Sequence, residues 1–210
     1  MISCYHQKES LYYDIMISIL MNQTSENIVN GVSVDKLFGI MDAIKTNSDI
    51  AKFNFRAKGN WISGAHTRTS INDFYGAGQK HNRNKTFVLE HDEPSVLLGT
   101  NGGANPGEYA LAALNGCLTS ALVYHAAAKG IQIDEIETIL DGDVDLLGFL
   151  GIDESVRNGY KKINVAFKIK ADNATDEQLN ELVLLAQRRS PIFDNISNPT
   201  PIEVNVERKP

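Results

Sequence analysis

The most constraining feature of the sequence is a stretch, Tyr109 to Ala128, that carries no formal charge when His125 is neutral. A helix this apolar is typically buried on most of its sides instead of lying with one face in solvent. Seven of its residues are alanine, and such small side chains allow other backbones to approach closely. Because a domain of this size could hardly bury the helix alone, the sequence predicts a homodimer.

Local signals mark both ends of this helix. Asn105 is a good N-cap, Pro106 suits the first helical position, and Glu108 stands three residues after the cap. Lys129-Gly130 supplies a C-terminal stop. The sequence therefore predicts one helix of about 24 residues, from Pro106 to Lys129.

Strand patterns precede the helix. From Phe53 to Trp61 apolar and polar residues alternate, which predicts a half-buried strand. Further strands are expected at Thr67 to Phe74 and Lys85 to His91, separated by a turn at residues 75–78. The Gly-rich loop at residues 99–103 lacks a following Lys-Ser/Thr, so we interpret it as a connector and not as a phosphate-binding loop.

More strands and a second helix follow the uncharged helix. Strands are expected at Ile133 to Asp145 and at Tyr160 to Lys170, the second with every other residue apolar. Thr175 and Gln178 form a capping box for a helix that Ser190-Pro191 ends, and a last strand is expected at residues 202–206. The order β-β-β-α-β-β-α-β predicts an α+β fold with two long helices against antiparallel sheets.

Residues 1–50 are expected to form a helical N-terminal extension of residues 51–210. Helical patterns occur at Ser10 to Met21 and at Val34 to Lys45. The apolar run Leu11 to Met21 is shorter than a membrane span and lacks the features of a signal peptide. The sequence thus predicts a cytoplasmic protein without a membrane partner.

The charge balance also narrows the range of partners. A net charge of -6 and a pI near 5.4 argue against nucleic-acid binding, which favours a basic surface. The two cysteines, Cys4 and Cys117, lie in a polar tail and in the apolar helix, so a structural disulfide between them is not expected in a reducing cytosol.

Cys117 is the main candidate for chemistry. A thiol in an apolar helix has a raised pKa unless a cation lies nearby, so reactivity would require an arginine. A buried inert cysteine is the competing interpretation, because this residue type is commonly buried. His125 lies about 80° from Cys117 around an ideal helix and is a poor partner, and His66 is less constrained. The acidic residues 141, 143 and 145 fail the calcium-loop pattern.

The segment Asn105-Pro106-Gly107-Glu108-Tyr109-Ala110-Leu111-Ala112-Ala113-Leu114-Asn115-Gly116-Cys117-Leu118-Thr119, with the predicted element order, resembles the OsmC/Ohr family of thiol-dependent hydroperoxide-detoxifying proteins. The resemblance covers about residues 53 to 207 and includes Asp92-Glu93-Pro94 and the motifs at 141–145 and 157–160. It implies an intertwined homodimer with thiol sites at the subunit interface.

The resemblance also implies roles for single residues. Cys117 matches the family's reactive cysteine, and Ser190 stands where peroxidase members have a second, resolving cysteine. Gly107 occupies the position of the family's glutamate, and Glu108 follows one residue late. Nine residues along an ideal helix is about 180°, so Glu108 should point away from Cys117. We expect Glu108 to cap the helix, with a catalytic or arginine-orienting role as the alternative.

The family's catalytic arginine precedes the helix, where Arg68 is preferred over Arg83. The resemblance implies a single-cysteine peroxidase for organic hydroperoxides in oxidative stress defence, with Cys117, Arg68 and Glu108 as candidate catalytic residues. An external thiol or dithiol would be the reductant, and neither a cofactor nor a metal is expected. The alternative is a non-catalytic OsmC-like module that binds a small apolar ligand or a partner at the dimer interface.

Overall fold

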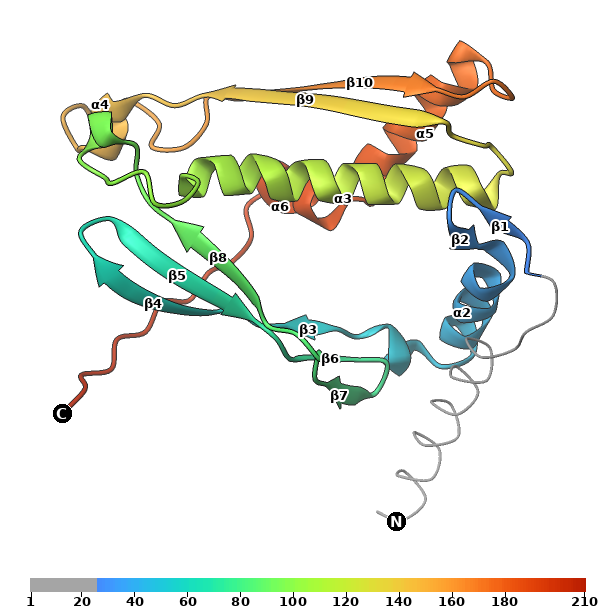
Figure 1. The fold of residues 1–210 in the computed structure, drawn as a ribbon, viewed down its shortest axis with the longest axis horizontal. Coiled ribbons are helices and arrows are strands. Elements are labelled where there is room, and N and C mark those ends of the chain that lie inside the picture. The colour runs from blue at the N-terminus through green and yellow to red at the C-terminus, as the bar shows by residue number, and fades with distance from the viewer. Residues whose placement is uncertain (1–25) are drawn as a thin grey trace, which may run out of the picture. The chain divides into compact units, whose positions relative to one another are not determined.

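The computed structural model describes residues 26–210, which form two compact units (Figure 1). The first unit ends at Ala110, and the second is Leu111–Pro210. The expected helix Ser10 to Met21 and Cys4 lie outside the described residues. The boundary between these units lies inside helix α3 (Pro106–Ala128) and not near residue 50. The expected division into an N-terminal extension and a domain of residues 51–210 therefore stays a prediction.

The first unit begins with a small hairpin and a helix. Strands β1 (Ile28–Val29) and β2 (Val32–Ser33) pair antiparallel, and helix α2 (Val34–Thr46) confirms the second helical pattern of the N-terminal extension. The hydroxyl of Ser33 caps α2 by accepting a hydrogen bond from the Lys36 N–H. A short 3₁₀ turn, η1 (Ser48–Ala51), follows.

Two three-stranded antiparallel sheets complete this unit. One has the order β3 (Asn54–Phe55), β6 (Phe74–Gly76), β7 (Gln79–His81), and the other has β4 (Lys58–Ser63), β5 (His66–Ile71), β8 (Phe87–His91). A turn η2 (Ser95–Leu97) follows β8. The turn between β6 and β7 consists of Ala77 and Gly78, both at positive φ, as two-residue hairpins require.

The expectation of a single half-buried strand from Phe53 to Trp61 is wrong. The chain forms β3 and β4 in different sheets, because β3 pairs with β6 while β4 pairs with β5. Phe55 and Trp61 are 68% and 72% exposed. Alternation of apolar and polar residues indicates a strand. It does not indicate whether another element of the same chain packs on the apolar face.

The second unit carries the longest elements (Figure 1). Helix α3 (Pro106–Ala128), which starts in the first unit, has the predicted extent. It leads into β9 (Glu135–Asp143), the short α4 (Leu146–Phe149), β10 (Lys162–Lys170), α5 (Asp176–Arg189) and α6 (Pro191–Ser197). The capping box of α5 is present as predicted. The mixed α+β class with antiparallel sheets is therefore confirmed.

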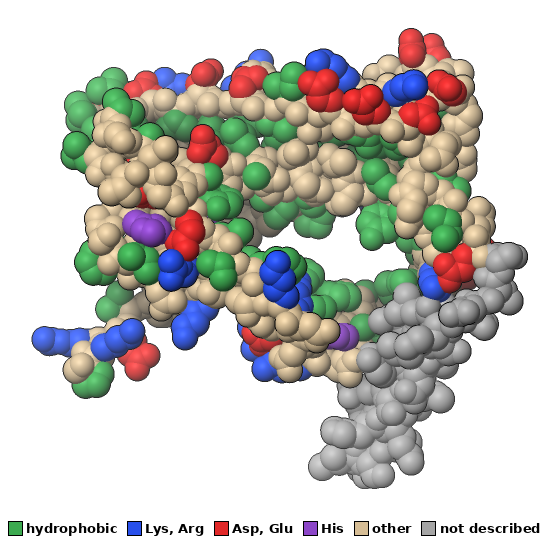
Figure 2. All heavy atoms as spheres, in the orientation of Figure 1, with side chains coloured by type: hydrophobic (Ala, Val, Ile, Leu, Met, Phe, Trp, Pro, Cys, Tyr) green, Lys and Arg blue, Asp and Glu red, His purple; other side chains and the backbone are tan. Residues whose placement is uncertain are grey.

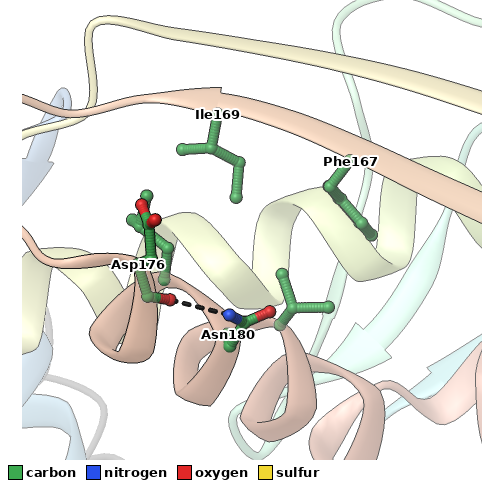
Figure 3. A pocket seen from close by; sticks show the side chains of 6 residues that line it. Phe167, Ile169, Asp176 and Asn180 are labelled. Atoms are coloured by element: carbon green, nitrogen blue, oxygen red, sulfur yellow. Dashed lines mark hydrogen bonds between the residues drawn. The ribbon is translucent and has the colours of Figure 1, made fainter.

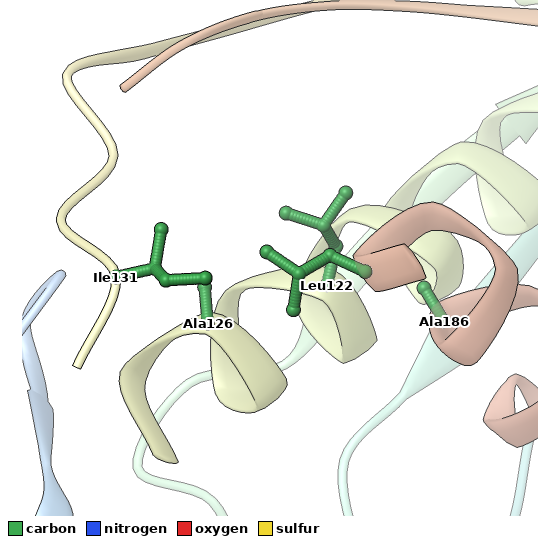
Figure 4. Close-up of a cluster of buried hydrophobic side chains, with 5 residues drawn as sticks. Leu122, Ala126, Ile131 and Ala186 are labelled. Atoms are coloured by element: carbon green, nitrogen blue, oxygen red, sulfur yellow. The ribbon is translucent and has the colours of Figure 1, made fainter. Parts of the chain in front are cut away.

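Strands β9 and β10 pair antiparallel along their full length, from Lys162 opposite Asp143 to Lys170 opposite Glu135. Burial alternates along both strands, as expected for a sheet with one covered face. Charged side chains line the outer face (Figure 2). The inner face packs on α3 and α5 around a core of five buried residues (Figure 4), which are Leu122, Ala126, Ile131, Leu182 and Ala186.

The last predicted strand is not formed. Residues 198–210 have no regular structure, and Ile202, Val204 and Val206 are 82–95% exposed. A strand needs a partner for its backbone hydrogen bonds, and this segment pairs with no other strand of residues 26–210. Helix α6, by contrast, was not expected.

Helix α3 is buried on one face in this single chain. Leu114, Leu118, Leu122 and Ala126 recur every four residues on its buried side. In the described part of the chain α3 is the one helix whose length and composition would suit a membrane span, a test that core helices of soluble proteins also pass. The predicted homodimer, which would cover more of α3, stays a prediction.

Candidate functional site

Cys117 lies in the middle of α3, between the buried residues Leu114 and Leu118. Cys117 is a free cysteine, and the residue is partly exposed. The neighbouring Asn115 accepts a 2.6 Å hydrogen bond from the hydroxyl of Thr138 on β9, which fixes this turn of α3 against the sheet. Cys117 therefore lies on a helix that is fixed against β9, at a position that is not fully buried.

Ser190, which the sequence resemblance equates with the family's second cysteine, is the N-cap of α6. Its side chain is buried, with 2% exposure, and its hydroxyl accepts a 3.1 Å hydrogen bond from the Phe193 N–H. This contact explains how a serine is accommodated at the junction of α5 and α6, since serine is a favoured N-cap.

Contacts of α5 and α6 with α3 follow an opposite order along the two parts of the chain. Lys129 at the end of α3 pairs with Glu181 near the start of α5 at 3.1 Å. Leu122 packs with Leu182 and Ala186 in the core. Leu114 and Phe193 of α6 line one cavity of about 430 Å³. Ser190 stands in the sequence between Ala186 and Phe193, whose partners on α3 are Leu122 and Leu114.

Glu108 caps the helix, as the sequence favoured. Its carboxylate accepts a 2.8 Å hydrogen bond from the Asn105 N–H, while Asn105 Oδ1 accepts a 2.7 Å bond from the Gly107 N–H. The side chain of Asn105 also donates to Glu93 at 2.5 Å. Both carboxylates near the start of α3 are thus engaged in holding the first turn.

We expect Glu108→Ala to lower the free energy of unfolding by about 1 kcal/mol, because the Asn105 N–H loses its acceptor. Glu108→Gln should retain most of the stability, since an amide oxygen can accept the same bond. Urea denaturation of both variants measures the difference. The matched control is Glu154→Ala, an exposed loop position that should change stability by less than about 0.5 kcal/mol.

Arg68 is held by a carboxylate that sequence reasoning did not identify. Arg68 on β5 lies directly opposite Glu90 on β8, and its Nε donates to Glu90 Oε1 at 2.6 Å. The other oxygen, Glu90 Oε2, is 2.8 Å from His66 Nε2. Hydrogen bonds from Arg68 and then from His66 lower the pKa of Glu90 below its usual value. The carboxylate is therefore shared between two basic side chains.

Arg83, the alternative to Arg68, has a structural role. Its guanidinium donates to the Asn72 carbonyl at 2.8 Å and lies 4.9 Å from the centre of the Phe74 ring. The guanidinium of Arg68, by contrast, uses only Nε within residues 26–210 and is half-exposed. These contacts favour Arg68 as the cation that could meet a further anion.

The Gly-rich loop is a connector, as expected, and Asp92 fixes it. Asp92 is 1% exposed and accepts hydrogen bonds from the Thr100 hydroxyl at 2.6 Å and from the Thr100 and Gly102 N–H groups. These bonds, the Thr100 hydroxyl first, hold the pKa of Asp92 well below its usual range. The acid in the Asp92-Glu93-Pro94 motif thus anchors the loop that leads to α3.

Tyr109 fastens the first turn of α3 to β8. Its hydroxyl donates to the Glu90 carbonyl at 2.9 Å, and its ring packs against His91 with 4.3 Å between centroids. The sequence showed Tyr109 only as the start of an apolar helix. Its hydrogen bond to Glu90 joins residues that are 19 positions apart, and no local sequence pattern predicts such a contact.

A second hollow lies between β10 and α5 (Figure 3). Its volume is about 270 Å³, and Phe167, Ile169, Leu179 and Val183 line it together with Asp176 and Asn180. Neither a thiol nor a basic side chain lines it, so it offers no group for redox chemistry. No group of three or more His, Cys, Asp or Glu suited to a metal ion occurs in residues 26–210.

Comparisons with known proteins point to the same family as the sequence motif in α3. A search of curated proteins finds no match to this sequence. Two similar solved structures are an OsmC-like protein from Mycoplasma pneumoniae and an OsmC-like protein of unknown function from Vibrio cholerae. The first is 16% identical with a TM-score of 0.54, covering 70% of this chain and 89% of that one. The second is 12% identical with a TM-score of 0.53, covering 68% and 92%.

At such identities the two structures show a shared fold alone. The model of the OsmC-like protein family matches residues 99–205, which is just over half of the chain. That range contains the whole of α3 with Cys117, both strands β9 and β10, and the α5–α6 junction at Ser190. The chain belongs to the OsmC-like protein family.

Proposed function

We propose that the protein reduces organic hydroperoxides through Cys117. The observation that carries the proposal is a free, partly exposed thiol on a rigid helix inside the segment that the OsmC-like family model matches. Hydroperoxides are small, so a partly exposed thiol suffices for access. Under this proposal the protein acts in oxidative stress defence in the cytoplasm.

The reaction begins with the thiolate of Cys117. Its sulfur attacks one peroxide oxygen, the O–O bond breaks, and the leaving alkoxide takes a proton to become an alcohol. Cys117 is oxidised to the sulfenic acid while the hydroperoxide is reduced by two electrons. A cation beside Cys117 would favour the thiolate over the thiol, and the family resemblance implies Arg68 for this role.

An external thiol completes the cycle in this proposal. Ser190 cannot form a disulfide, so a small thiol or dithiol attacks the sulfenic sulfur, releasing water and forming a mixed disulfide. A second thiol then attacks the mixed disulfide and frees Cys117 as the thiol. Two reductant thiols are oxidised to one disulfide for each hydroperoxide consumed.

Mass spectrometry of the protein after one equivalent of cumene hydroperoxide tests the function directly. Addition of one oxygen atom at Cys117, trapped as a dimedone adduct, supports it. An unmodified Cys117 under excess peroxide contradicts it.

The same proposal includes a homodimer. In the single chain α3 is buried on one face, with Tyr124 51% exposed on another. Large apolar side chains on β3 and β4, such as Phe55 and Trp61, are also exposed, and a second chain could cover them. We expect sedimentation at micromolar concentration to give the mass of two chains. A stable, well-folded monomer would count against the arrangement.

A second candidate function is a non-catalytic module that binds a small apolar ligand or a partner at the dimer interface. The observation that favours it is that Ser190 caps α6 and Glu108 caps α3, so neither side chain is free for catalysis, while Gly107 stands where the resemblance implies a glutamate. Such a module would bind an apolar probe without oxidation of Cys117. The peroxide experiment therefore separates the two candidates.

A further inference from the structure

We infer that the cavity lined by β10, α6 and the residues just before β10 binds a small amphipathic anion, an organic carboxylate with an alkyl body. Its volume is about 430 Å³, within the range of about 300–1,000 Å³ that is typical of ligand pockets. The cavity lies entirely within the unit Leu111–Pro210. The inference does not depend on the chemistry of Cys117, which is not part of the lining.

Most of the lining is apolar. Ile163 and Val165 of β10 belong to the inner face of the sheet, because burial alternates along this strand. Phe193 and Ile196 of α6 and the buried Leu114 of α3 complete this part of the lining. These five side chains offer a hydrocarbon surface to an alkyl group, and removal of apolar area from water favours its binding.

The charged part of the lining is basic. It contains no aspartate or glutamate and three cations, which are Arg157, Lys161 and Lys162. Lys161 is paired with Asp145 at 2.6 Å, and Lys162 is an exposed residue of β10. Arg157, by contrast, forms no hydrogen bond or ion pair with any of residues 26–210. Because a guanidinium can bind both oxygens of a carboxylate at once, an organic anion is the ligand that fits this cavity.

The backbone that carries Arg157 is held in place. Just before it, the N–H and the hydroxyl of Ser155 both donate to the Asp153 carboxylate, at 2.9 and 2.7 Å. The Arg157 carbonyl also approaches α4 so closely that a Cβ at Gly148 would lie 2.9 Å from its oxygen. A side chain on a fixed backbone loses less conformational freedom on binding a ligand than one on a free loop.

Titration calorimetry of the full chain with three probes of equal chain length tests the inference, the probes being octanoate, octylammonium and 1-octanol. We expect octanoate to bind at least about tenfold more tightly than the other two, because only the anion can pair with Arg157. Its affinity should also fall as the salt concentration is raised, since salt screens an ion pair at a partly open site.

Arg157→Gln and Arg188→Gln form the matched pair of variants. Arg188 is exposed on α5 and does not line the cavity, so the control removes the same charge elsewhere. Arg157→Gln should weaken octanoate binding about tenfold and leave 1-octanol binding unchanged. Arg188→Gln should change neither. Equal octanoate affinity in the two variants, or equal affinity of the wild type for all three probes, would overturn the inference.

The apolar part of the site has its own readout. Ile196→Asn should weaken the binding of octanoate and of 1-octanol by similar factors, since both alkyl chains lose an apolar contact. Ile202→Asn, at a position that is 82% exposed, is the control and should change neither. Octanoate binding that is unchanged in Ile196→Asn would place the alkyl chain elsewhere and contradict the inference.

Absence of octanoate binding to the wild type would also overturn the inference, as expected if a second chain fills the cavity in the homodimer. The proposed function fails separately, when peroxide leaves Cys117 unmodified. Calorimetry with these probes involves no oxidation of the thiol, so it tests the cavity whatever the outcome of the peroxide experiment.

Discussion

Cumene hydroperoxide consumption with a thiol reductant is expected to fall about a hundredfold or more in Cys117→Ser, to the rate without protein, because the proposed chemistry has a single nucleophile. Dimedone should label the wild-type protein at Cys117 and leave the variant unlabelled. The substitution exchanges sulfur for oxygen at a partly exposed position, so the fold should be retained. Peptide mapping locates the adduct, and a coupled assay measures turnover.

The second cysteine of the chain provides the matched control. Cys4→Ser should consume peroxide at the wild-type rate, since Cys4 lies in a polar tail of the sequence, far from the family's motif. Retained activity in Cys117→Ser together with loss of activity in Cys4→Ser would assign the chemistry to Cys4 and contradict the proposed role of Cys117. Absence of labelling in both variants and in the wild type would leave the binding module as the better candidate.

The elements that the sequence predicted well are those with local signals. Helix α3 runs from Pro106 to Ala128 because Asn105 and Glu108 satisfy its first N–H groups and Gly130 follows its end. The alternation of apolar residues along β10 also predicted its buried face correctly, since Phe167 and Ile169 pack against the core. In both cases neighbours in the sequence determine the structure.

The features that sequence reasoning missed depend on distant partners. Residues 202–206 alternate like a strand, but without a neighbouring strand they form none. Glu90 reaches Arg68 only because β5 and β8 pair in one register, and a shift by one residue would turn its side chain to the opposite face. The family resemblance pointed to Arg68 and Cys117 as candidates, whereas the carboxylate that binds Arg68 could be found only from the pairing of the strands.

Ser190→Cys should let position 190 form a disulfide with Cys117 on oxidation. Leu122 of α3 packs with Ala186 of α5, and Leu114 of α3 lines one cavity with Phe193 of α6, so we expect position 190 near the part of α3 that contains Cys117. A disulfide requires the two Cα atoms to lie within about 7 Å. The introduced thiol would attack the Cys117 sulfenic acid and release water, and a dithiol would then reduce the disulfide.

Turnover with a dithiol reductant should rise about tenfold, because an internal thiol acts at an effective concentration that an external thiol does not reach. The substitution also removes the Ser190 hydroxyl that caps α6, which should cost about 1 kcal/mol of stability. The variant is therefore expected to be less stable and yet faster, a combination that a general improvement in folding would not produce.

Peptide mapping of the oxidised variant decides the outcome, with Ser155→Cys in an exposed loop as the control for nonspecific crosslinking. A disulfide between positions 117 and 190, absent in the control, would support a site in which this chain retains the family's geometry without its resolving thiol. If position 190 never crosslinks to Cys117 while the sulfenic acid still forms, the correspondence of Ser190 with the second cysteine is wrong. Cys117 would then depend on external thiols because of where it lies in the fold, and not because a second cysteine is missing at position 190.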